Sequence, residues 1–236
     1  MKGKIILIPT YLSPSNTRDF LSKDIHDQIA NIRCFLVENV RTARRFISSL
    51  KLGLVIEDLQ FEVLDKRTEP EHLNRLILPL STGQNIGIIS EAGMPGIADP
   101  GQLMVSFAHT RNIDVFCLPG ASSITMALAS SGFNGQQFTF HGYLPIDNSE
   151  RDRKIKQLEM ELKKTSYTQL FMETPYRNDK FLAALLNALS PNTMLFIGAD
   201  LSGADCFSKT KSIKDWKLNV PKLGKTPCVF GIGTTS

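Results

Sequence analysis

The sequence predicts an α/β protein made of two α/β domains, with a mostly parallel sheet in the first domain and a mixed sheet in the second. Three observations lead to this fold class. The chain has 236 residues, 42% of them hydrophobic, and this length suits two domains of ordinary size. Short apolar runs alternate with amphipathic segments in the first half, as in parallel sheets. The character of the chain changes in its second half, and we place the domains at residues 1–118 and 119–236.

The first half alternates strands and helices. Four apolar runs predict buried strands at residues 4–8, 34–37, 86–89 and 113–118, and residues 54–64 look extended. Helical periodicity or a helix-starting proline predicts helices at residues 19–32, 42–50, 70–80 and 103–109. This alternation indicates a parallel sheet that is covered on both faces.

The second half is less regular. Helices are predicted at residues 124–130, 150–164 and 181–189, and strands at residues 138–140, 169–172, 194–199 and 228–232. Residues 208–225 contain six lysines against one aspartate, which predicts a solvated basic edge or arm.

Net charge, cysteine content and the length of the apolar runs limit the kinds of partner, metal site and location that the protein can have. The net charge of +4 permits an anionic partner without requiring one. The four cysteines show no metal-ligand spacing with the histidines, so no metal is expected, and Cys117 and Cys228 are interpreted as small core residues. Neither a signal peptide nor a membrane span is indicated, because no apolar run approaches the roughly 18 residues that a span needs. We therefore expect a cytoplasmic protein with no membrane partner.

Residues 86–101 form the most informative stretch. An apolar strand breaks into a loop that contains three glycines, two prolines and the carboxylates Glu91 and Asp99. An ordinary strand-to-helix connection needs only about two to six residues. This loop is longer and stiffer, and it follows the carboxyl end of a strand, where open α/β sheets bind ligands. A second such turn, residues 119–123, precedes a small-residue helix that its serines can cap.

Carboxylates follow four predicted strands: Glu38, Glu91, Glu173 and Asp200. Each one alone could be a helix cap or a surface residue, but four together predict a shared cleft at the carboxyl edge of a sheet. The motifs of dinucleotide enzymes, P-loop nucleotidases, serine hydrolases and zinc proteases are missing.

Several motifs resemble one known family in register. Residues 90–101, Ser-Glu-Ala-Gly-Met-Pro-Gly-Ile-Ala-Asp-Pro-Gly, resemble the Ser-Asp-Ala-Gly-Thr-Pro-Gly-Ile-Ser-Asp-Pro-Gly motif of the RsmI-like bacterial 16S ribosomal RNA cytidine 2′-O-methyltransferases, members of the tetrapyrrole methylase superfamily. Further similar segments follow in the same order along the chain, at residues 7–10, 38–41, 118–125, 140–145 and 171–177.

This resemblance implies two α/β domains, a homodimer, and S-adenosylmethionine bound in a cleft between the domains. Carried over residue by residue, it nominates as cofactor-binding residues Pro9, Glu91, Ala92, Met94, Ser122, Ser123, Met172, Ala199, Asp200 and Pro227. The chain also departs from the family pattern. Tyr176 stands where histidine is usual, Asn39 replaces an acidic residue, and the segment around Asp200 loses two basic residues.

Methyl transfer to a hydroxyl requires alignment and removal of a proton. Our hypothesis is that Glu38 or Glu173 is the general base, because both follow strands, and that Arg41 and Arg177 position substrate phosphates. The expected partner is ribosomal RNA or the 30S subunit. Two alternatives remain open, namely a methylase of a tetrapyrrole-like small molecule or a protein side chain, and a non-catalytic module that binds S-adenosylmethionine or RNA.

Overall fold

The computed structural model describes residues 3–13 and 21–235. Contacts divide the chain into two compact units. Unit 1 comprises Met1–Leu12 and Asn16–Ser122, and unit 2 comprises Ser13–Ser15 and Ser123–Ser236. The division therefore falls between Ser122 and Ser123, within the 119–123 turn.

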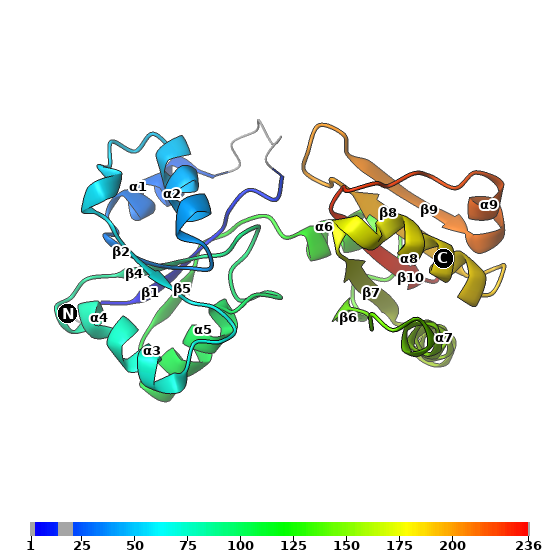
Figure 1. Ribbon diagram of the computed structural model, residues 1–236, viewed down its shortest axis with the longest axis horizontal. Helices are drawn as coiled ribbons and strands as arrows, with labels where there is room; N and C mark the ends of the chain where they lie inside the picture. The colour runs from blue at the N-terminus through cyan, green and yellow to red at the C-terminus, as the bar shows by residue number, and fades with distance from the viewer. Residues whose placement is uncertain (1–2, 14–20, 236) are drawn as a thin grey trace. The chain divides into compact units, whose positions relative to one another are not determined.

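Unit 1 is built on a five-stranded sheet with the order β3-β2-β4-β1-β5 (Figure 1). All of its strand pairs are parallel, which confirms the predicted parallel sheet. The strands are β1 (Ile5–Ile8), β2 (Cys34–Val37), β3 (Gln60–Val63), β4 (Ile86–Ile89) and β5 (Val115–Cys117).

Helices cover both faces of this sheet. Ile6 and Ile8 pack with buried residues of α1 (Lys23–Ala30) and α2 (Val40–Ser49), whereas Ile5 and Leu7 pack with those of the helices on the other face. The remaining elements of the unit are η1 (Ile56–Asp58), α3 (Pro70–Leu76), α4 (Leu78–Ser81) and α5 (Gly101–Thr110). Strands buried on both faces explain why β1, β2 and β4 are continuous apolar runs.

Three details of unit 1 differ from the sequence-based expectations. The described part of the helix predicted at residues 19–32 begins at Lys23, where the Ser22 side chain caps it, and residues 14–20 lie outside the described residues. The predicted helix at residues 70–80 is divided at Ile77, because Pro79 cannot donate the backbone hydrogen bond that would continue it. Cys117 is exposed, so its interpretation as a core residue was wrong.

The exposure of Cys117 follows from the place of its strand. β5 is an edge strand that pairs only with β1, and Phe116 beside Cys117 is 43% exposed. The apolar run at residues 113–118 therefore forms a partly exposed edge strand, not the buried strand that was predicted.

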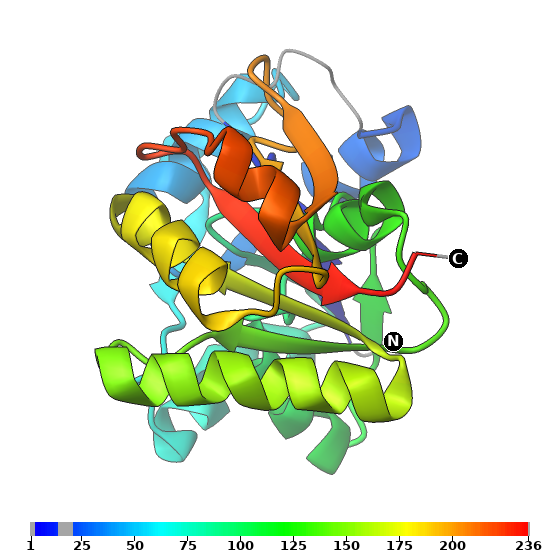
Figure 2. The same ribbon diagram turned by 90° about the vertical axis from the view of Figure 1, so that its right-hand side faces the viewer.

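Unit 2 is built on a second five-stranded sheet, with the order β6-β7-β10-β8-β9 (Figure 2). β10 is antiparallel to β7 and β8, whereas β6 and β7 are parallel, so the sheet is mixed as predicted. Its strands are β6 (Phe138–Tyr143), β7 (Thr168–Glu173), β8 (Met194–Ala199), β9 (Phe207–Ser212) and β10 (Cys228–Gly233). Its helices are α6 (Ser123–Ser131), α7 (Asn148–Thr165), η2 (Pro175–Arg177), α8 (Asn178–Ala188) and α9 (Ile213–Leu218).

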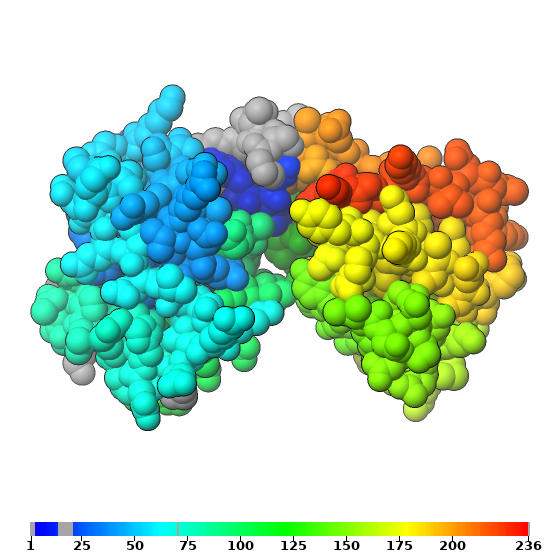
Figure 3. Space-filling model, viewed as in Figure 1, coloured from blue at the N-terminus to red at the C-terminus, as the bar shows by residue number. Residues whose placement is uncertain are grey.

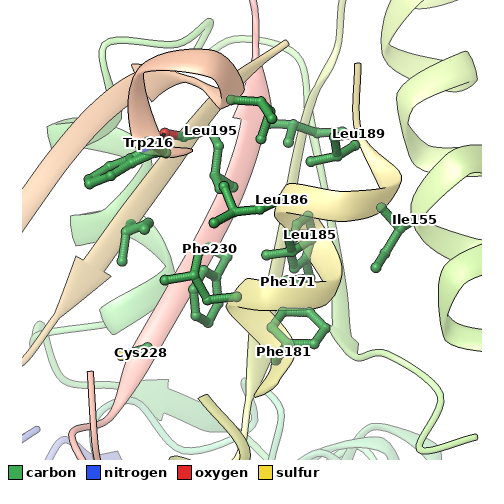
Figure 4. Close-up of a cluster of buried hydrophobic side chains, with 14 of the residues drawn as sticks. Ile155, Phe171, Phe181, Leu185, Leu186, Leu189, Leu195, Trp216, Cys228 and Phe230 are labelled. Atoms are coloured by element: carbon green, nitrogen blue, oxygen red, sulfur yellow. Dashed lines mark hydrogen bonds between the residues drawn. The ribbon is translucent and has the colours of Figure 1, made fainter. Parts of the chain in front are cut away.

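The larger core of unit 2 lies between its sheet and the helices α7, α8 and α9 (Figure 4). Phe171, Phe181 and Phe230 pack ring against ring, with centroid separations of 5.2 to 6.3 Å. Trp216 is buried in the same core and donates a 2.8 Å hydrogen bond from Nε1 to the carbonyl of Leu195. The lysine-rich segment therefore contains the edge strand β9 and the packed helix α9, so of the two predicted alternatives the basic edge agrees with the structure and the arm does not.

Among residues 3–13 and 21–235, no helix combines the length and the apolar character that crossing a membrane would require.

Candidate functional site

The carboxyl ends of the parallel strands define one edge of unit 1. Because β1, β2, β4 and β5 run in the same direction, the residues that follow them emerge at the same edge of the sheet. Pro9 and Thr10 follow β1, Glu38 follows β2, and Glu91 lies in the loop after β4. This edge thus carries several of the residues that the sequence nominated.

The loop after β4 is held in shape by its own hydrogen bonds. The backbone N–H of Thr10 donates to the Gly93 carbonyl over 3.0 Å, and the Ser90 hydroxyl donates to the same carbonyl over 3.2 Å. The Asp99 carboxylate accepts from the backbone N–H groups of Gly96 and Gly101, both at 2.7 Å. Asp99 therefore fixes the turn and the start of α5, and burial raises the pKa of its carboxyl.

Close backbone packing joins this loop to the turn after β5. A Cβ added to Gly120 would overlap the ring of Pro9, at 2.5 Å from Cγ, and would lie 3.1 Å from the Met94 sulfur. Gly93 has a φ of +78°, a conformation that glycine adopts without steric cost. The structure thus brings Pro9, Met94 and the 118–122 turn together, and this explains why glycine is needed at position 120.

Two acidic residues, Glu38 and Glu91, lie close together after the ends of β2 and β4. The Glu38 carboxylate accepts a hydrogen bond from the backbone N–H of Glu91 over 3.1 Å, and the Glu91 carboxylate accepts one from the Thr42 hydroxyl. Burial raises the pKa of Glu38, and the nearby carboxylates of Asp99 and Glu91 add to the rise. Glu38 is therefore a better proton acceptor at neutral pH than an exposed glutamate.

The other nominated residues of unit 1 lie to the sides of the Glu38–Glu91 contact. Arg41 is exposed in the first turn of α2, where the Asn39 side chain caps its backbone N–H. Ala92 is exposed in the loop after β4, and Ser122 is buried at the end of the unit. Ser123 begins α6 and therefore belongs to unit 2.

Unit 2 gathers the remaining nominated residues at one edge of its own sheet. Cys228, the first residue of β10, is paired with Glu173 at the end of β7 and with Ala199 at the end of β8. The backbone N–H of Asp200 donates to the Pro227 carbonyl over 3.0 Å. The register thus places Met172, Ala199, Asp200 and Pro227 around the start of β10.

Glu173 is a buried carboxylate that is engaged by its neighbours. Its Oε1 accepts from Arg177 Nη2 at 2.6 Å, from Arg177 Nε at 3.1 Å and from the backbone N–H of Thr174 at 2.6 Å. The side chain of Glu173 is 3% exposed and that of Arg177 is 31% exposed. These hydrogen bonds fix the position of the carboxylate and pair it with the Arg177 guanidinium.

Asp200 shapes its own turn. It has a φ of +46°, and its carbonyl accepts from the backbone N–H of Gly203 over 2.8 Å. Its carboxylate accepts from the backbone N–H of Asp205 over 3.2 Å. A non-glycine residue at positive φ costs free energy and is enriched at ligand-binding positions.

The sequence analysis did not nominate two residues at the carboxyl edge of the unit 1 sheet, Thr10 and Thr42. Both use hydroxyls at the carboxyl edge of the sheet, to the Ser90 carbonyl and to Glu91 respectively. The signal for Thr42 was its place in the first turn of a helix that starts directly after Glu38-Asn39. Within the part of the chain that the structure describes, no three His, Cys, Asp or Glu side chains gather as metal ligands do.

The fold and these clusters define a class of protein: a chain of two α/β units, each of which presents polar loops at the carboxyl ends of its strands, as ligand-binding α/β proteins do. The model of the tetrapyrrole (corrin/porphyrin) methylases matches residues 42–213. The chain therefore belongs to the tetrapyrrole methylase family.

Individual proteins agree with this assignment. The "Ribosomal RNA small subunit methyltransferase I" of Synechocystis sp. is 35% identical over 127 residues, which are 54% of this chain and 44% of that protein. The protein of the same name from Mesomycoplasma conjunctivae is 30% identical over 177 residues, which are 75% of this chain and 69% of that protein. The chain thus spans less than half the length of the Synechocystis relative.

A solved structure supports the fold. The crystal structure of the methyltransferase CobJ matches with a TM-score of 0.62, covering 98% of this chain and 94% of that one at 14% identity. This likeness confirms the α/β fold class that the sequence predicted.

Proposed function

We propose that the protein is an S-adenosylmethionine-dependent methyltransferase that modifies a ribose 2′-hydroxyl of ribosomal RNA. The observation that carries the proposal is the agreement between the family match and the strand-end loops of unit 1. The relatives from Synechocystis sp. and Mesomycoplasma conjunctivae are both named as ribosomal RNA small subunit methyltransferases. The loops supply the polar groups and glycines that a bound methyl donor requires.

The residues present fit this cofactor. Gly120 lets the turn after β5 pack directly against Pro9 and Met94, which brings these nominated residues together, and the carboxylates of Glu38 and Glu91 suit a cationic ligand. In unit 1 the cofactor would be held by Pro9, Glu91, Ala92, Met94 and Ser122. In unit 2 it would be held by Ser123, Met172, Ala199, Asp200 and Pro227. When bound, S-adenosylmethionine supplies an electrophilic methyl group on a positively charged sulfur.

Glu38 is the stronger candidate for the general base. Its raised pKa suits removal of the proton from the ribose hydroxyl, and the Glu91 backbone N–H orients its carboxylate. The carboxylate of Glu173 is held by three hydrogen bonds, two of them from Arg177. We therefore assign Glu173 to the positioning of Arg177, and Arg177 and Arg41 to contacts with RNA phosphates.

The partner in this proposal is ribosomal RNA, free or in the 30S subunit. The protein would act in the cytoplasm as a homodimer. The positive net charge of +4 supports an anionic partner, and the affinity for RNA should fall as salt rises.

Two experiments test the proposal. Titration calorimetry with S-adenosylmethionine should show binding to one site per chain, and an absence of binding at millimolar cofactor would refute the enzyme assignment. Mass spectrometry of ribosomal RNA from cells with and without the protein should show one lost ribose methyl. If cofactor binds but the ribosomal RNA is unchanged, the substrate assignment fails, and a small molecule or a protein becomes the substrate to test.

A further inference from the structure

Unit 2 contains a pocket of about 150 Å³ at the end of β7. The polar part of its lining consists of Asn148 and Arg151 from the start of α7, Glu173 from β7, Arg177 from η2 and Lys180 from α8. Ile146 and Phe181 supply an apolar part. In Figure 3 the green surface of α7 adjoins the yellow surface of α8 on the face of unit 2 that is turned to the viewer.

The charge of this pocket is positive. Arg151, Arg177 and Lys180 carry three positive charges, and Glu173 carries the one negative charge of the lining. Glu173 and Arg177 are paired with each other, so the net positive charge of the lining comes from Arg151 and Lys180. Asp152, which is half-exposed, lies 3.3 Å from Arg151 Nη2. The pocket therefore favours an anionic occupant.

Arg151 is held in an unusual environment. Its side chain is only 15% exposed, and its Nε is buried with no hydrogen-bond partner among the described residues. A buried donor without an acceptor is unfavourable, so the Arg151 guanidinium is held at the pocket with unused hydrogen-bonding capacity. The guanidinium group presents planar, paired donors that match the oxygens of a phosphate.

An exposed aromatic side chain lies next in the chain to Arg177, a residue of the pocket lining, and it favours a nucleotide over a free ion as the occupant. Tyr176, directly before Arg177, is 80% exposed, and Lys225 Nζ lies 5.1 Å from the centre of its ring. Proteins that bind single-stranded nucleic acid combine basic grooves with exposed aromatic rings on which bases stack. A free phosphate or carboxylate would make no use of such a ring.

We propose that the pocket lined by Arg151, Arg177 and Lys180 binds a backbone phosphate of single-stranded RNA, while Tyr176 stacks on a neighbouring base. This proposal rests on the proposed function, since it places part of the RNA substrate on unit 2. It assigns a role to Arg151, Lys180 and Tyr176, in addition to the phosphate contact expected for Arg177.

The test measures RNA binding directly, without cofactor. The probe is a fluorescently labelled single-stranded RNA oligonucleotide, and its anisotropy is followed at several salt concentrations. Arg151→Gln and Lys180→Gln should each weaken binding by about tenfold or more, as the loss of a charged hydrogen bond predicts, and should reduce the salt slope by about 0.7 for each lost phosphate contact. Lys156→Gln, an exposed position on α7, is the matched control and should bind as the wild type does.

The variant Tyr176→Ala tests whether the occupant is a nucleotide or a free phosphate ion. It should weaken binding of the oligonucleotide by roughly five- to a hundredfold, as loss of one stacked base predicts, and should leave competition by inorganic phosphate unchanged. Tyr176→Phe should retain most of the affinity. Two outcomes would overturn the proposal. The first is wild-type RNA affinity in both Arg151→Gln and Lys180→Gln, with unchanged melting temperatures. The second is that inorganic phosphate no longer competes with the RNA in these two variants although they bind the RNA as tightly as the wild type does.

Failure of the proposed function gives a different pattern. If no methyl is transferred to ribosomal RNA while Arg151→Gln and Lys180→Gln still weaken RNA binding, the pocket assignment stands and the catalytic one falls. If methyl transfer to ribosomal RNA is confirmed while these variants bind RNA as the wild type does, the pocket assignment falls alone. Calorimetry with S-adenosylmethionine should give wild-type cofactor affinity for Arg151→Gln, Lys180→Gln and Tyr176→Ala.

Discussion

The carboxylate of Glu38 accepts a hydrogen bond from the backbone N–H of Glu91 over 3.1 Å, although the two residues lie 53 positions apart in the chain. The contact exists because β2 and β4 are parallel neighbours with Val37 paired to Ile89, so that Glu38 emerges beside the Ser90-Glu91 segment. It links the proposed base to the loop that is expected to hold the cofactor.

Replacing Glu38 with glutamine should lower the rate of methyl transfer by about 10²- to 10⁴-fold, the usual contribution of a general base. Glutamine can still accept the Glu91 hydrogen bond, so the affinity for S-adenosylmethionine should change little. Single-turnover transfer of a radiolabelled methyl group to 30S subunits measures the rate, with Glu57→Gln at an exposed position as the control. Wild-type turnover in Glu38→Gln would eliminate the assignment.

Replacing Glu173 with glutamine should act in a different way. The substitution removes the charge that holds the Arg177 guanidinium, so the Michaelis constant for RNA should rise more than the turnover number falls. Steady-state kinetics at varied RNA concentration separates the two parameters. A large fall in turnover with an unchanged Michaelis constant would transfer the role of base from Glu38 to Glu173.

The raised pKa of Glu38 predicts the pH dependence of both rate and stability. The base acts only when it is deprotonated, so the rate should fall with decreasing pH at a higher pH than for an ordinary glutamate, and Glu38→Gln should lack this fall. Because the folded state binds this proton more tightly than the unfolded state does, the ionised carboxylate opposes folding once the pH exceeds its unfolded pKa.

Glu38→Gln should therefore be somewhat more stable than the wild type at neutral pH, and the two should converge as the pH falls below the ordinary glutamate range. Urea unfolding at neutral and at acidic pH measures this difference. A glutamine variant less stable than the wild type at neutral pH would contradict the raised pKa.

Gly120→Ala should disrupt the packing of the turn after β5 against Pro9. The new Cβ would lie 2.5 Å from Pro9 Cγ and 3.1 Å from the sulfur of Met94, and the rigid proline ring cannot turn away. Overpacking of this kind costs about 1–3 kcal/mol, and cofactor affinity should fall as the turns move apart. Differential scanning calorimetry and cofactor titration measure the two effects. Gly135→Ala is the matched control, because no atom lies within 4 Å of its added Cβ.

Glu159 should stabilise unit 2 at neutral pH. Its carboxylate is buried on α7 and accepts from the backbone N–H of Ser190 at 2.8 Å and from the Ser190 and Thr193 hydroxyls, and Lys163 Nζ lies 3.2 Å away. Burial by itself raises the pKa of this carboxyl, but these hydrogen bonds outweigh it and the pKa is lowered.

A lowered folded pKa gives stability that is present above the unfolded pKa and lost as the pH falls through the folded one. Glu159→Gln should therefore cost about 1–3 kcal/mol in urea unfolding at neutral pH, and the difference from the wild type should shrink in acid. Glu161→Gln, an exposed position on the same helix, should have no such effect. If Glu159→Gln lost the same free energy of unfolding at both pH values, the packing of the side chain and not its charge would account for the loss.

Local patterns in the sequence were sufficient to predict most of the elements. The strands at residues 34–37, 86–89 and 194–199 have the predicted bounds, because each is a continuous apolar run that ends at a polar residue or at a structure-breaking segment. The loop after β4 was recognised from its glycines and prolines, which have a conformational meaning wherever they stand. The motifs along the chain also indicated the methylase family, which the comparisons show.

Only the tertiary structure decided which of these segments meet. Strand order makes β5 an edge strand and leaves Cys117 exposed, although its apolar run resembles that of a central strand. It also joins Glu38 to Glu91 in unit 1, and in unit 2 it places Glu173 and Ala199 on either side of Cys228. Arg151 and Arg177 line one pocket although they lie on different helices. Periodicity reports whether a residue faces the core, but a contact between distant residues depends on which elements become neighbours, and this is fixed by the packing of the whole unit.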